Sequence, residues 1–227
     1  MEIVKIAEHE LFRAQLPVAL DFLAKRKRIE YSDFLEVHRI LFEGLYPWAG
    51  KDRAEVLPDS AVKKGDLYFC HPSDCRLAVT EGLSVAQDKK QMDKRPGFIM
   101  GMFAYGHPFL DGNGRTMLLV HAELCFRANM SVNWLLTSKQ PYLDALTKEI
   151  QAPNDGHLDA YLKPFIEPQI PRGEHRNRRV IRYVGNSPGV CQLAHLDTVI
   201  CTENGRLEGA LVFLRVLVFR QIPPHCC

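Results

Sequence analysis

The chain has 227 residues, of which 46% are hydrophobic. This length and composition suffice for one well-buried core with a small appendage, and they argue against two full domains. The 29 Lys and Arg residues nearly balance the 27 Asp and Glu residues, which leaves a formal net charge of only +2. A charge this small favours neither a nucleic-acid partner nor an anionic membrane surface, so any anion binding has to be local.

The cysteines and the apolar stretches indicate the cellular compartment in which the protein is expected. Seven cysteines, an odd number, form neither a disulfide framework nor a paired zinc-binding pattern, and reduced thiols in a cytoplasm fit them best. Residues 1–5 lack the basic leader and apolar run of a signal peptide. Residues 209–219 are apolar but too short for a membrane span, and Arg215 interrupts them. We therefore expect a cytoplasmic protein with no membrane span, and leave open export by a signal that the sequence does not reveal.

The first part of the chain has the apolar spacing of helices. Apolar residues recur at helical intervals over residues 11–42, and a basic run at residues 25–28 divides them. This pattern predicts two amphipathic helices. Pro47 and Gly50 punctuate the sequence and are expected to end the second of them.

A β-hairpin is expected next, followed by more helices. Short apolar pieces flank Lys63, Lys64 and Gly65, and the glycine favours a tight turn between two strands. Helical periodicity or helix-forming composition then predicts helices, in chain order, over residues 73–91, 98–105, 116–127, 139–150 and 157–166.

The expected fold class is therefore mainly α, with a small β-hairpin and a short strand-bearing C-terminal appendage. Prolines and a glycine near residues 168–173 mark a boundary. We divide the chain into a helical domain, residues 1–168, and a segment of unknown role, residues 169–227, made of a basic linker and a small appendage. In the second segment, β-branched and apolar runs indicate strands at residues 180–181, 198–200 and 211–213.

Residues 107–115, with the sequence His-Pro-Phe-Leu-Asp-Gly-Asn-Gly-Arg, concentrate groups that handle phosphate. His107 can accept a proton near neutral pH, and Asp111 can bind a hard divalent cation. The two glycines let backbone N–H groups close on phosphate oxygens, and Arg115 offers a planar cation that matches those oxygens. Because the turn leads into a helix, the helix N-terminus adds its own preference for an anion.

The position of His107 before a proline bears on its role. Proline disfavours helix in the preceding residue and pushes it towards extended geometry, so we expect His107 to lie in a loop and to face a cleft. From there it can deprotonate a hydroxyl that attacks a phosphate held on the glycine turn. Each feature alone is a weak signal, because Asn-Gly pairs are common in turns and a lone histidine is often structural. Their combination predicts a site for phosphoryl or nucleotidyl transfer.

These nine residues resemble the signature of Fic domains, which are helical domains that transfer part of a nucleotide, usually AMP from ATP, to a protein hydroxyl. The resemblance extends to other segments. Residues 38–42, 46–51 and Arg53 resemble an upstream block of the family, and residues 63–69 resemble its β-hairpin flap. About residues 10–166 are covered, and the segment after residue 170 is not.

The resemblance implies a role for each residue of the loop. His107 would be the general base on the target hydroxyl, Asp111 would bind Mg²⁺, and Arg115 would neutralise charge on the leaving portion. The anion hole for the phosphates of ATP would be formed by Gly112, Asn113 and Gly114.

The resemblance also implies how a target docks. Lys63, Lys64 and Gly65 lie in the segment similar to the flap, which would align an extended target segment by strand addition. The implied function is a protein adenylyltransferase that transfers AMP from its co-substrate Mg-ATP to a Ser, Thr or Tyr hydroxyl of a target protein.

One departure from the family pattern keeps two alternatives open. Leu118 stands where the family usually has a second arginine, three residues after the first, which removes a contact to the γ-phosphate. The chain would then transfer another phosphate-containing group, by phosphorylation or phosphocholination, or would be a catalytically lapsed nucleotide-binding or docking module. The inhibitory Ser/Thr-to-Glu motif of many relatives has no match, which leaves a separate inhibitory protein as an open partner besides the target.

Overall fold

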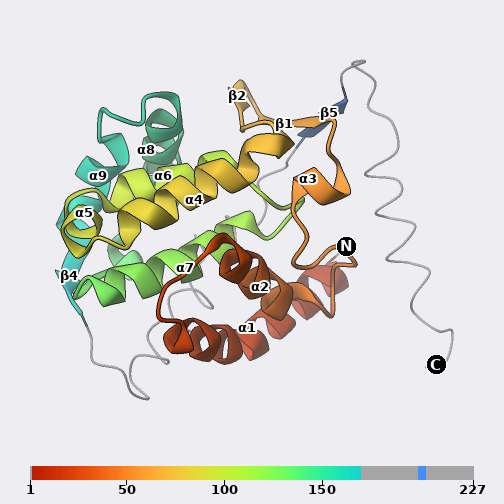
Figure 1. Ribbon diagram of the computed structural model, residues 1–227, viewed down its shortest axis with the longest axis horizontal. Helices are drawn as coiled ribbons and strands as arrows, with labels where there is room; N and C mark the ends of the chain where they lie inside the picture. The colour runs from red at the N-terminus through yellow and green to blue at the C-terminus, as the bar shows by residue number, and fades with distance from the viewer. Residues whose placement is uncertain (1, 170–198, 203–227) are drawn as a thin grey trace, which may run out of the picture.

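The computed structural model describes residues 2–169 and 199–202, and its body is a bundle of helices (Figure 1). The α-helices, in chain order, are α1 (Glu2–Lys25), α2 (Tyr31–Phe42), α3 (Arg53–Val56), α4 (Cys75–Ala86), α5 (Lys89–Lys94), α6 (Pro96–Gly106), α7 (Asn113–Arg127), α8 (Lys139–Gln151) and α9 (His157–Leu162). Three short 3₁₀ turns accompany them: η1 (Pro72–Asp74), η2 (Trp134–Leu136) and η3 (Lys163–Phe165). The mainly helical class expected from the sequence is confirmed.

The hairpin lies where it was expected. Strands β1 (Ser60–Lys64) and β2 (Leu67–Tyr68) pair antiparallel, with Lys63 opposite Tyr68. Gly65 makes the turn with a φ of 56°, in the left-handed region that glycine enters without strain. We call residues 60–68 the hairpin flap.

Two expected helices differ in extent from the helices observed. Residues 73–91 form two helices, α4 and α5, because the side chain of Asp88 accepts a hydrogen bond from the N–H of Lys90 at 2.8 Å and starts a new helix there. The last helix, expected to reach residue 166, ends at Leu162. Pro164 follows within η3, where its lack of an N–H favours a short turn over a longer helix.

Helix α6 is the centre of the bundle. It packs against α4, α7, α8 and α9, and nearly all of its side chains are buried, which explains its apolar composition on every face. Helices α1 and α2 pack together and against α7, on the other side of α7 from α8 and α9 (Figure 1). The loop that joins α6 to α7 carries residues 107–115, so two packed helices hold its ends.

The C-terminal part returns to the hairpin flap. Strand β5 (Val199–Thr202) pairs antiparallel with β1, with Val62 opposite Ile200, and gives a sheet in the order β2-β1-β5. This strand overlaps the expected strand at residues 198–200. The strands expected at residues 180–181 and 211–213, and the basic linker, lie outside the described residues. A second small sheet pairs β3 (Met130–Val132) with β4 (Ile166–Pro168).

No membrane-spanning helix occurs in the part of the chain that the structure describes, because none of its helices combines the necessary length with enough apolar character.

Candidate active site

Helix α6 ends by placing His107 in an unusual backbone conformation. His107 is the C-terminal cap of the helix, and its N–H donates to Phe103 O at 3.2 Å. Its φ of 38° and ψ of 54° lie in the left-handed region. The expectation that His107 lies outside a helix is confirmed, but the expected extended geometry is wrong. The helix C-cap, which commonly takes the left-handed conformation, outweighs the effect of the following proline here.

The imidazole of His107 is buried and packs against Phe69, the residue that follows the hairpin flap. It is 7% exposed and stacks on the ring of Phe69 with a centroid distance of 4.0 Å. Burial first, and then the positive charges of Arg53 and Lys64, lower the pKa of His107 from 6.5 to about 3. The ring is therefore neutral at physiological pH, and within the described residues its buried Nε2 has no hydrogen-bond partner.

A small cavity of about 50 Å³ brings part of the site together. His107, Asn113, Gly114 and Lys64 line it, and the rest of its wall is largely apolar, with Leu67, Phe69, Ala104, Met117, Leu143, Leu146, Thr147 and Ile150. Three residues of the 107–115 loop thus share one cavity with a lysine of the hairpin flap. Lys63 and Gly65, the other two residues expected in target docking, do not line it.

The glycine turn is fixed by contacts that leave no room for a side chain. Gly112 has a φ of 79°, and a Cβ built there would lie 2.6 Å from Cε2 of Phe42. His38 holds the preceding carbonyl: its Nδ1 accepts from the N–H of Gly50 at 2.9 Å, so its Nε2 is the nitrogen that donates to Asp111 O at 3.0 Å. Burial lowers the pKa of His38 to about 3, which keeps this tautomer neutral.

The side chain of Asn113 ties the loop to itself. Its Oδ1 accepts from the N–H of Phe109 at 2.9 Å, and its Nδ2 donates to Phe109 O at 2.7 Å. Phe109 is fully buried and stacks on His38 at 3.7 Å. The amide side chain therefore shapes the loop, and an anion hole at Asn113 would have to be built from backbone N–H groups.

Such N–H groups are available at the start of α7. The helix has 15 residues and begins at Asn113, and Thr116 is the residue whose N–H bonds back to Gly112 O, at 3.0 Å. The N–H groups of the first turn have no carbonyl within the helix to bond to, so the helix N-terminus retains its capacity for an anion.

Asp111 and Arg115 lie beside each other at this turn. Oδ1 of Asp111 accepts from the N–H of Gly112 at 2.5 Å and lies 3.6 Å from Nη2 of Arg115. The Asp111 side chain is 46% exposed, whereas that of Arg115 is 5% exposed, with its guanidinium 4.5 Å from the ring centroid of Phe42. A carboxylate is a ligand that a hard divalent cation prefers, and a nucleotide and water can supply the other ligands of such a cation. The described residues contain no cluster of three or more His, Cys, Asp and Glu side chains that could hold a metal by themselves.

Arg53 is a positioning residue whose importance the sequence did not reveal. It is fully buried, its Nε donates to His107 O at 2.7 Å, and its Nη2 donates to Cys70 O at 2.9 Å. Its own backbone N–H donates to Pro108 O at 2.7 Å. One guanidinium therefore joins the end of the hairpin flap to the start of the 107–115 loop. The only sequence signal was the place of Arg53 in the upstream block.

Leu118 is buried in the hydrophobic core, 1% exposed. Leucine therefore supplies no charge at the position where the sequence pattern led us to look for a second arginine.

The edge of the hairpin flap that belongs to β1 is occupied. Within the described residues, β1 pairs with β2 on one side and with β5 on the other. Lys63 extends its Nζ over the ring of Tyr68, at 5.8 Å from the centroid, and Gly65 has no neighbouring atom within 4 Å of a built Cβ. The tip of the flap is therefore loosely packed, and its β1 edge is already paired.

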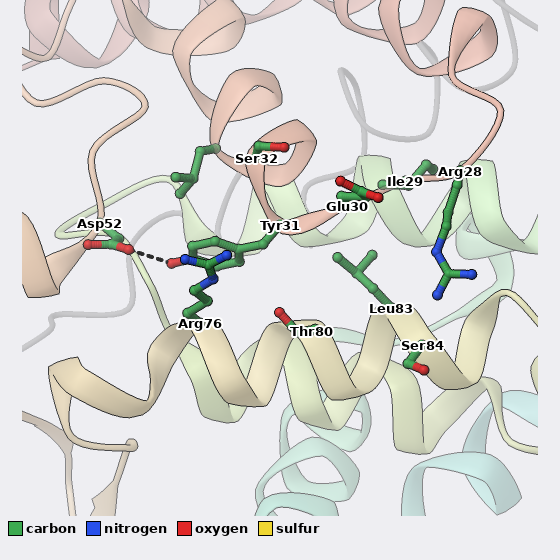
Figure 2. Close-up of a pocket in the computed structure, with 11 residues that line it drawn as sticks. Arg28, Ile29, Glu30, Tyr31, Ser32, Asp52, Arg76, Thr80, Leu83 and Ser84 are labelled. Atoms are coloured by element: carbon green, nitrogen blue, oxygen red, sulfur yellow. Dashed lines mark hydrogen bonds between the residues drawn. The ribbon is translucent and has the colours of Figure 1, made fainter.

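A second and larger cavity, of about 510 Å³, lies between the start of α2 and helix α4 (Figure 2). Tyr31, Asp52 and Arg76 form one end of it, where the Tyr31 hydroxyl donates to Oδ2 of Asp52 at 2.7 Å. None of the residues of the 107–115 loop lines this cavity.

Comparison with known proteins shows what this chain is similar to. Residues 28–125 match the model of the Fic/DOC family. The probable protein adenylyltransferase y4lH of Sinorhizobium fredii is 25% identical over 129 residues, which make up 53% of this chain and 65% of the relative. The protein adenylyltransferase VbhT of Bartonella schoenbuchensis is 30% identical over 121 residues, 50% of this chain and 24% of the relative. The chain thus spans less than two thirds of either relative.

Solved structures share the fold. The BepC protein of Bartonella tribocorum, solved with bound AMPPNP, has a TM-score of 0.58 and 16% identity, and the match covers 73% of this chain and 88% of that one. The N-terminal Fic domain of a Bartonella quintana effector, solved with bound ADP, has a TM-score of 0.58 at 16% identity, with 73% and 86% covered. That of Bep8 from Bartonella sp. 1-1C has a TM-score of 0.60 at 13% identity, with 72% and 85% covered. Residues 28–125, which include the 107–115 loop between α6 and α7, thus match the Fic/DOC family model, and the solved structures share the fold.

Proposed function

We propose that the chain is a protein adenylyltransferase, which transfers AMP from Mg-ATP to a Ser, Thr or Tyr hydroxyl of a target protein. The observation that carries this proposal is the shared cavity, which is lined by His107, whose Nε2 has no partner among the described residues, and by Asn113 and Gly114 at the start of α7. A base and an anion-binding turn meet there. Two similar proteins are named adenylyltransferases, one of them a probable one, and two proteins of the same fold bind AMPPNP or ADP.

The residues of the turn suit the triphosphate. The backbone N–H groups at the start of α7 would bind phosphate oxygens, and the helix dipole adds to their attraction. Arg115 lies beside Asp111 on the same turn and brings a cation that is always charged. Asp111 would hold Mg²⁺, which neutralises phosphate charge when it is bound.

His107 would take the proton of the attacking hydroxyl. The hydroxyl oxygen bonds to the α-phosphorus, the bond from the α-phosphorus to the bridging oxygen breaks, and pyrophosphate leaves. The low pKa of His107, about 3, keeps Nε2 free to accept that proton but makes it a weak base. A bound triphosphate would raise this pKa, because negative charge near the ring offsets the positive charges of Arg53 and Lys64.

The hairpin flap would align the target. A target segment that adds to β1 has to replace β5, because both would use the same edge of that strand. Lys64 lines the cavity with His107, so a segment held by the flap would lie close to the base.

A second function has one observation in its favour. Leu118, at the position of the usual second arginine, is buried and uncharged, so it would offer no charged contact to a γ-phosphate. A nucleotide held in a different position on the turn would present another phosphate-containing group for transfer.

The test is transfer of label from ATP labelled at the α-phosphate, with the purified chain and a cell lysate. We expect labelled proteins with the wild type and none with His107→Ala, because the variant lacks the base. His71→Ala is the matched control, since His71 is exposed and its side chain bonds only to the neighbouring Ser73 among described residues. Circular dichroism confirms that both variants are folded. Equal labelling by wild type and His107→Ala would refute the proposal.

Intact-mass measurement of a modified target separates the two functions. An added AMP group supports adenylyl transfer, whereas an added phosphate or phosphocholine group supports the second function. Magnesium-dependent ATP binding in calorimetry, with no group transferred to any protein, would favour the lapsed binding module.

A further inference from the structure

A pair of thiols lies directly beneath the candidate active site. Cys70 follows strand β2, Cys75 begins helix α4, and both are buried. Their sulfur atoms are 3.8 Å apart. A disulfide requires a separation of about 2.05 Å, so a small approach of the two sulfurs would join them.

The charge around this pair favours a thiolate at Cys75. Nη2 of Arg53 lies 3.3 Å from Sγ of Cys75, and the other acceptors of this buried guanidinium, among described residues, are backbone carbonyls. Cys75 also begins a helix of 12 residues, whose N-terminal end favours negative charge. The hydrogen bond from the Cys70 thiol first, and the charge of Arg53 after it, lower the pKa of Cys75 although burial opposes them.

The same charge excludes a simple metal site. A cation bound between the two sulfurs would lie close to the guanidinium of Arg53, which is always charged. A reactive thiolate next to a second thiol is instead the arrangement of a dithiol that oxidises to a disulfide.

The larger cavity borders residues that are next to the pair in the chain. Its wall contains Asp52 and Arg76, which are the chain neighbours of Arg53 and Cys75 (Figure 2). A molecule the size of hydrogen peroxide fits easily into a space of about 510 Å³.

We propose that Cys70 and Cys75 form a peroxide-reactive dithiol whose oxidation to a disulfide disturbs the position of His107. The Cys75 thiolate attacks one oxygen of hydrogen peroxide, the O–O bond breaks, and hydroxide leaves and takes up a proton to become water. The product is a sulfenic acid at Cys75. The sulfur of Cys70 then attacks the sulfenic sulfur, its thiol proton joins the departing hydroxide as a second water, and the disulfide forms. Two thiols are oxidised and one peroxide is reduced.

Contacts of the pair connect oxidation to the active site. Gly106 O, 3.2 Å from Sγ of Cys70, is a second acceptor for the one thiol proton that Cys70 also offers to Cys75, and the backbone N–H of Cys70 donates to Tyr105 O at 3.1 Å. A disulfide removes the first of these bonds and deprives Arg53 of its sulfur acceptor. Since Arg53 also holds His107 O, and Phe69 beside Cys70 stacks on the imidazole, the ring would lose part of its support.

The first experiment measures the disulfide itself. Full-length chain with Cys191, Cys201, Cys226 and Cys227 changed to Ser is treated with hydrogen peroxide, and its thiols are then mapped by differential alkylation and peptide mass spectrometry. We expect Cys70 and Cys75 to become linked and to be released by dithiothreitol. Cys125 is the built-in control, because it is buried and burial raises the pKa of its thiol. The proposal is overturned if both thiols stay reduced, or if Cys125 reacts as fast as they do.

The second experiment measures the effect on the site without depending on enzymatic activity. Hydrogen exchange of the backbone over residues 103–110 is followed by mass spectrometry in reduced and oxidised protein. We expect faster exchange after oxidation and no change in a peroxide-treated Cys75→Ser variant, which cannot form the bond. Unchanged exchange in protein with the disulfide formed would overturn the link to His107.

The effect on transfer rests on the proposed function and is read separately. Oxidised protein should label targets about 10- to 100-fold more slowly than reduced protein, because small displacements of a reacting group cost rates of this order. If the disulfide and the change in exchange are both observed but neither form transfers label, the dithiol proposal stands and the adenylyltransferase proposal fails. If the two forms transfer label equally, the proposed coupling is wrong.

Discussion

The 107–115 loop and the hairpin flap face the same cavity but are built in opposite ways. The loop is fixed by buried contacts: Asn113 bonds twice to Phe109, His38 holds Asp111 O, and Arg53 holds His107 O. The flap has short strands, an exposed turn at Gly65, and an edge that is paired with a strand from far along the chain. Chemistry requires fixed groups, whereas docking different target segments requires an edge that can exchange its partner.

The two glycine turns give the sharpest contrast. Gly112→Ala should destabilise the protein by about 2 to 5 kcal/mol, because a left-handed alanine costs about 1–2 kcal/mol and overpacking against Phe42 adds about 1–3 kcal/mol. Gly65 also has a positive φ, but a Cβ built there has open space around it. For Gly65→Ala we therefore expect the unfolding free energy to fall by only about 1–2 kcal/mol. Urea unfolding measures both. Equal losses would show that the 107–115 loop is no more tightly packed than the flap.

Arg53 joins the two regions, and its removal should affect both. Arg53→Met leaves buried carbonyls such as those of His107 and Cys70 without a donor, at about 1–3 kcal/mol each. We expect a loss of about 3 kcal/mol or more in unfolding free energy and a strong loss of label transfer.

Arg53→Lys is the control, because it keeps the charge but lacks the planar fork that reaches several carbonyls. It should restore part of the stability and little of the transfer. Full transfer by Arg53→Met would contradict the positioning role.

Three buried histidines predict a loss of stability in acid. The folded-state pKa of His38 and of His107 is about 3, and that of His121, which burial also lowers, is about 4. Between these values and the unfolded pKa near 6.5, the unfolded chain binds more protons, so stability falls as pH falls. From pH 7 to pH 5 we expect a loss of up to about 2 kcal/mol per histidine.

Urea unfolding at several pH values measures this slope. His107→Asn removes one of the three groups, so its pH dependence should be shallower by about a third. No flattening in this variant would show that His107 titrates normally in the folded protein.

The flap prediction has the smallest expected effect. The double variant Ile200→Pro, Cys201→Pro removes two consecutive backbone N–H donors of β5. Neighbouring N–H groups of a strand point to opposite sides, so one of the two donors faces β1. Losing one such bond, worth about 0.5–1.5 kcal/mol, should free the β1 edge and raise target labelling about 2- to 10-fold. The thermal unfolding midpoint should hardly change. Unaltered labelling would mean that targets do not compete with β5 for this edge.

The sequence predicted what depends on local spacing. The helices of the bundle, the hairpin turn at Gly65 and the position of residues 107–115 at a helix start follow from periodicity and turn chemistry, which act over a few residues. The placement of the site residues followed only in part: His107, Asn113, Gly114 and Lys64 line one cavity, whereas Lys63 and Gly65 do not.

What the sequence missed depends on contacts between distant residues. The burial of Arg53 is set by partners such as His107 O, which is 54 positions away, and the tie from His38 to Asp111 O spans 73 positions. The left-handed backbone at His107 comes from the helix end that precedes it. The pairing of β5 with β1 joins segments that no local pattern connects.

The account depends most on where the nucleotide binds. A crystal structure of the chain with Mg²⁺ and a non-hydrolysable ATP analogue tests this directly. We predict phosphates on the backbone N–H groups at the start of α7, the metal ion at Asp111, and the α-phosphate within reach of a hydroxyl bonded to Nε2 of His107. A nucleotide bound instead in the larger cavity beside Tyr31 and Arg76, with the glycine turn empty, would contradict the account.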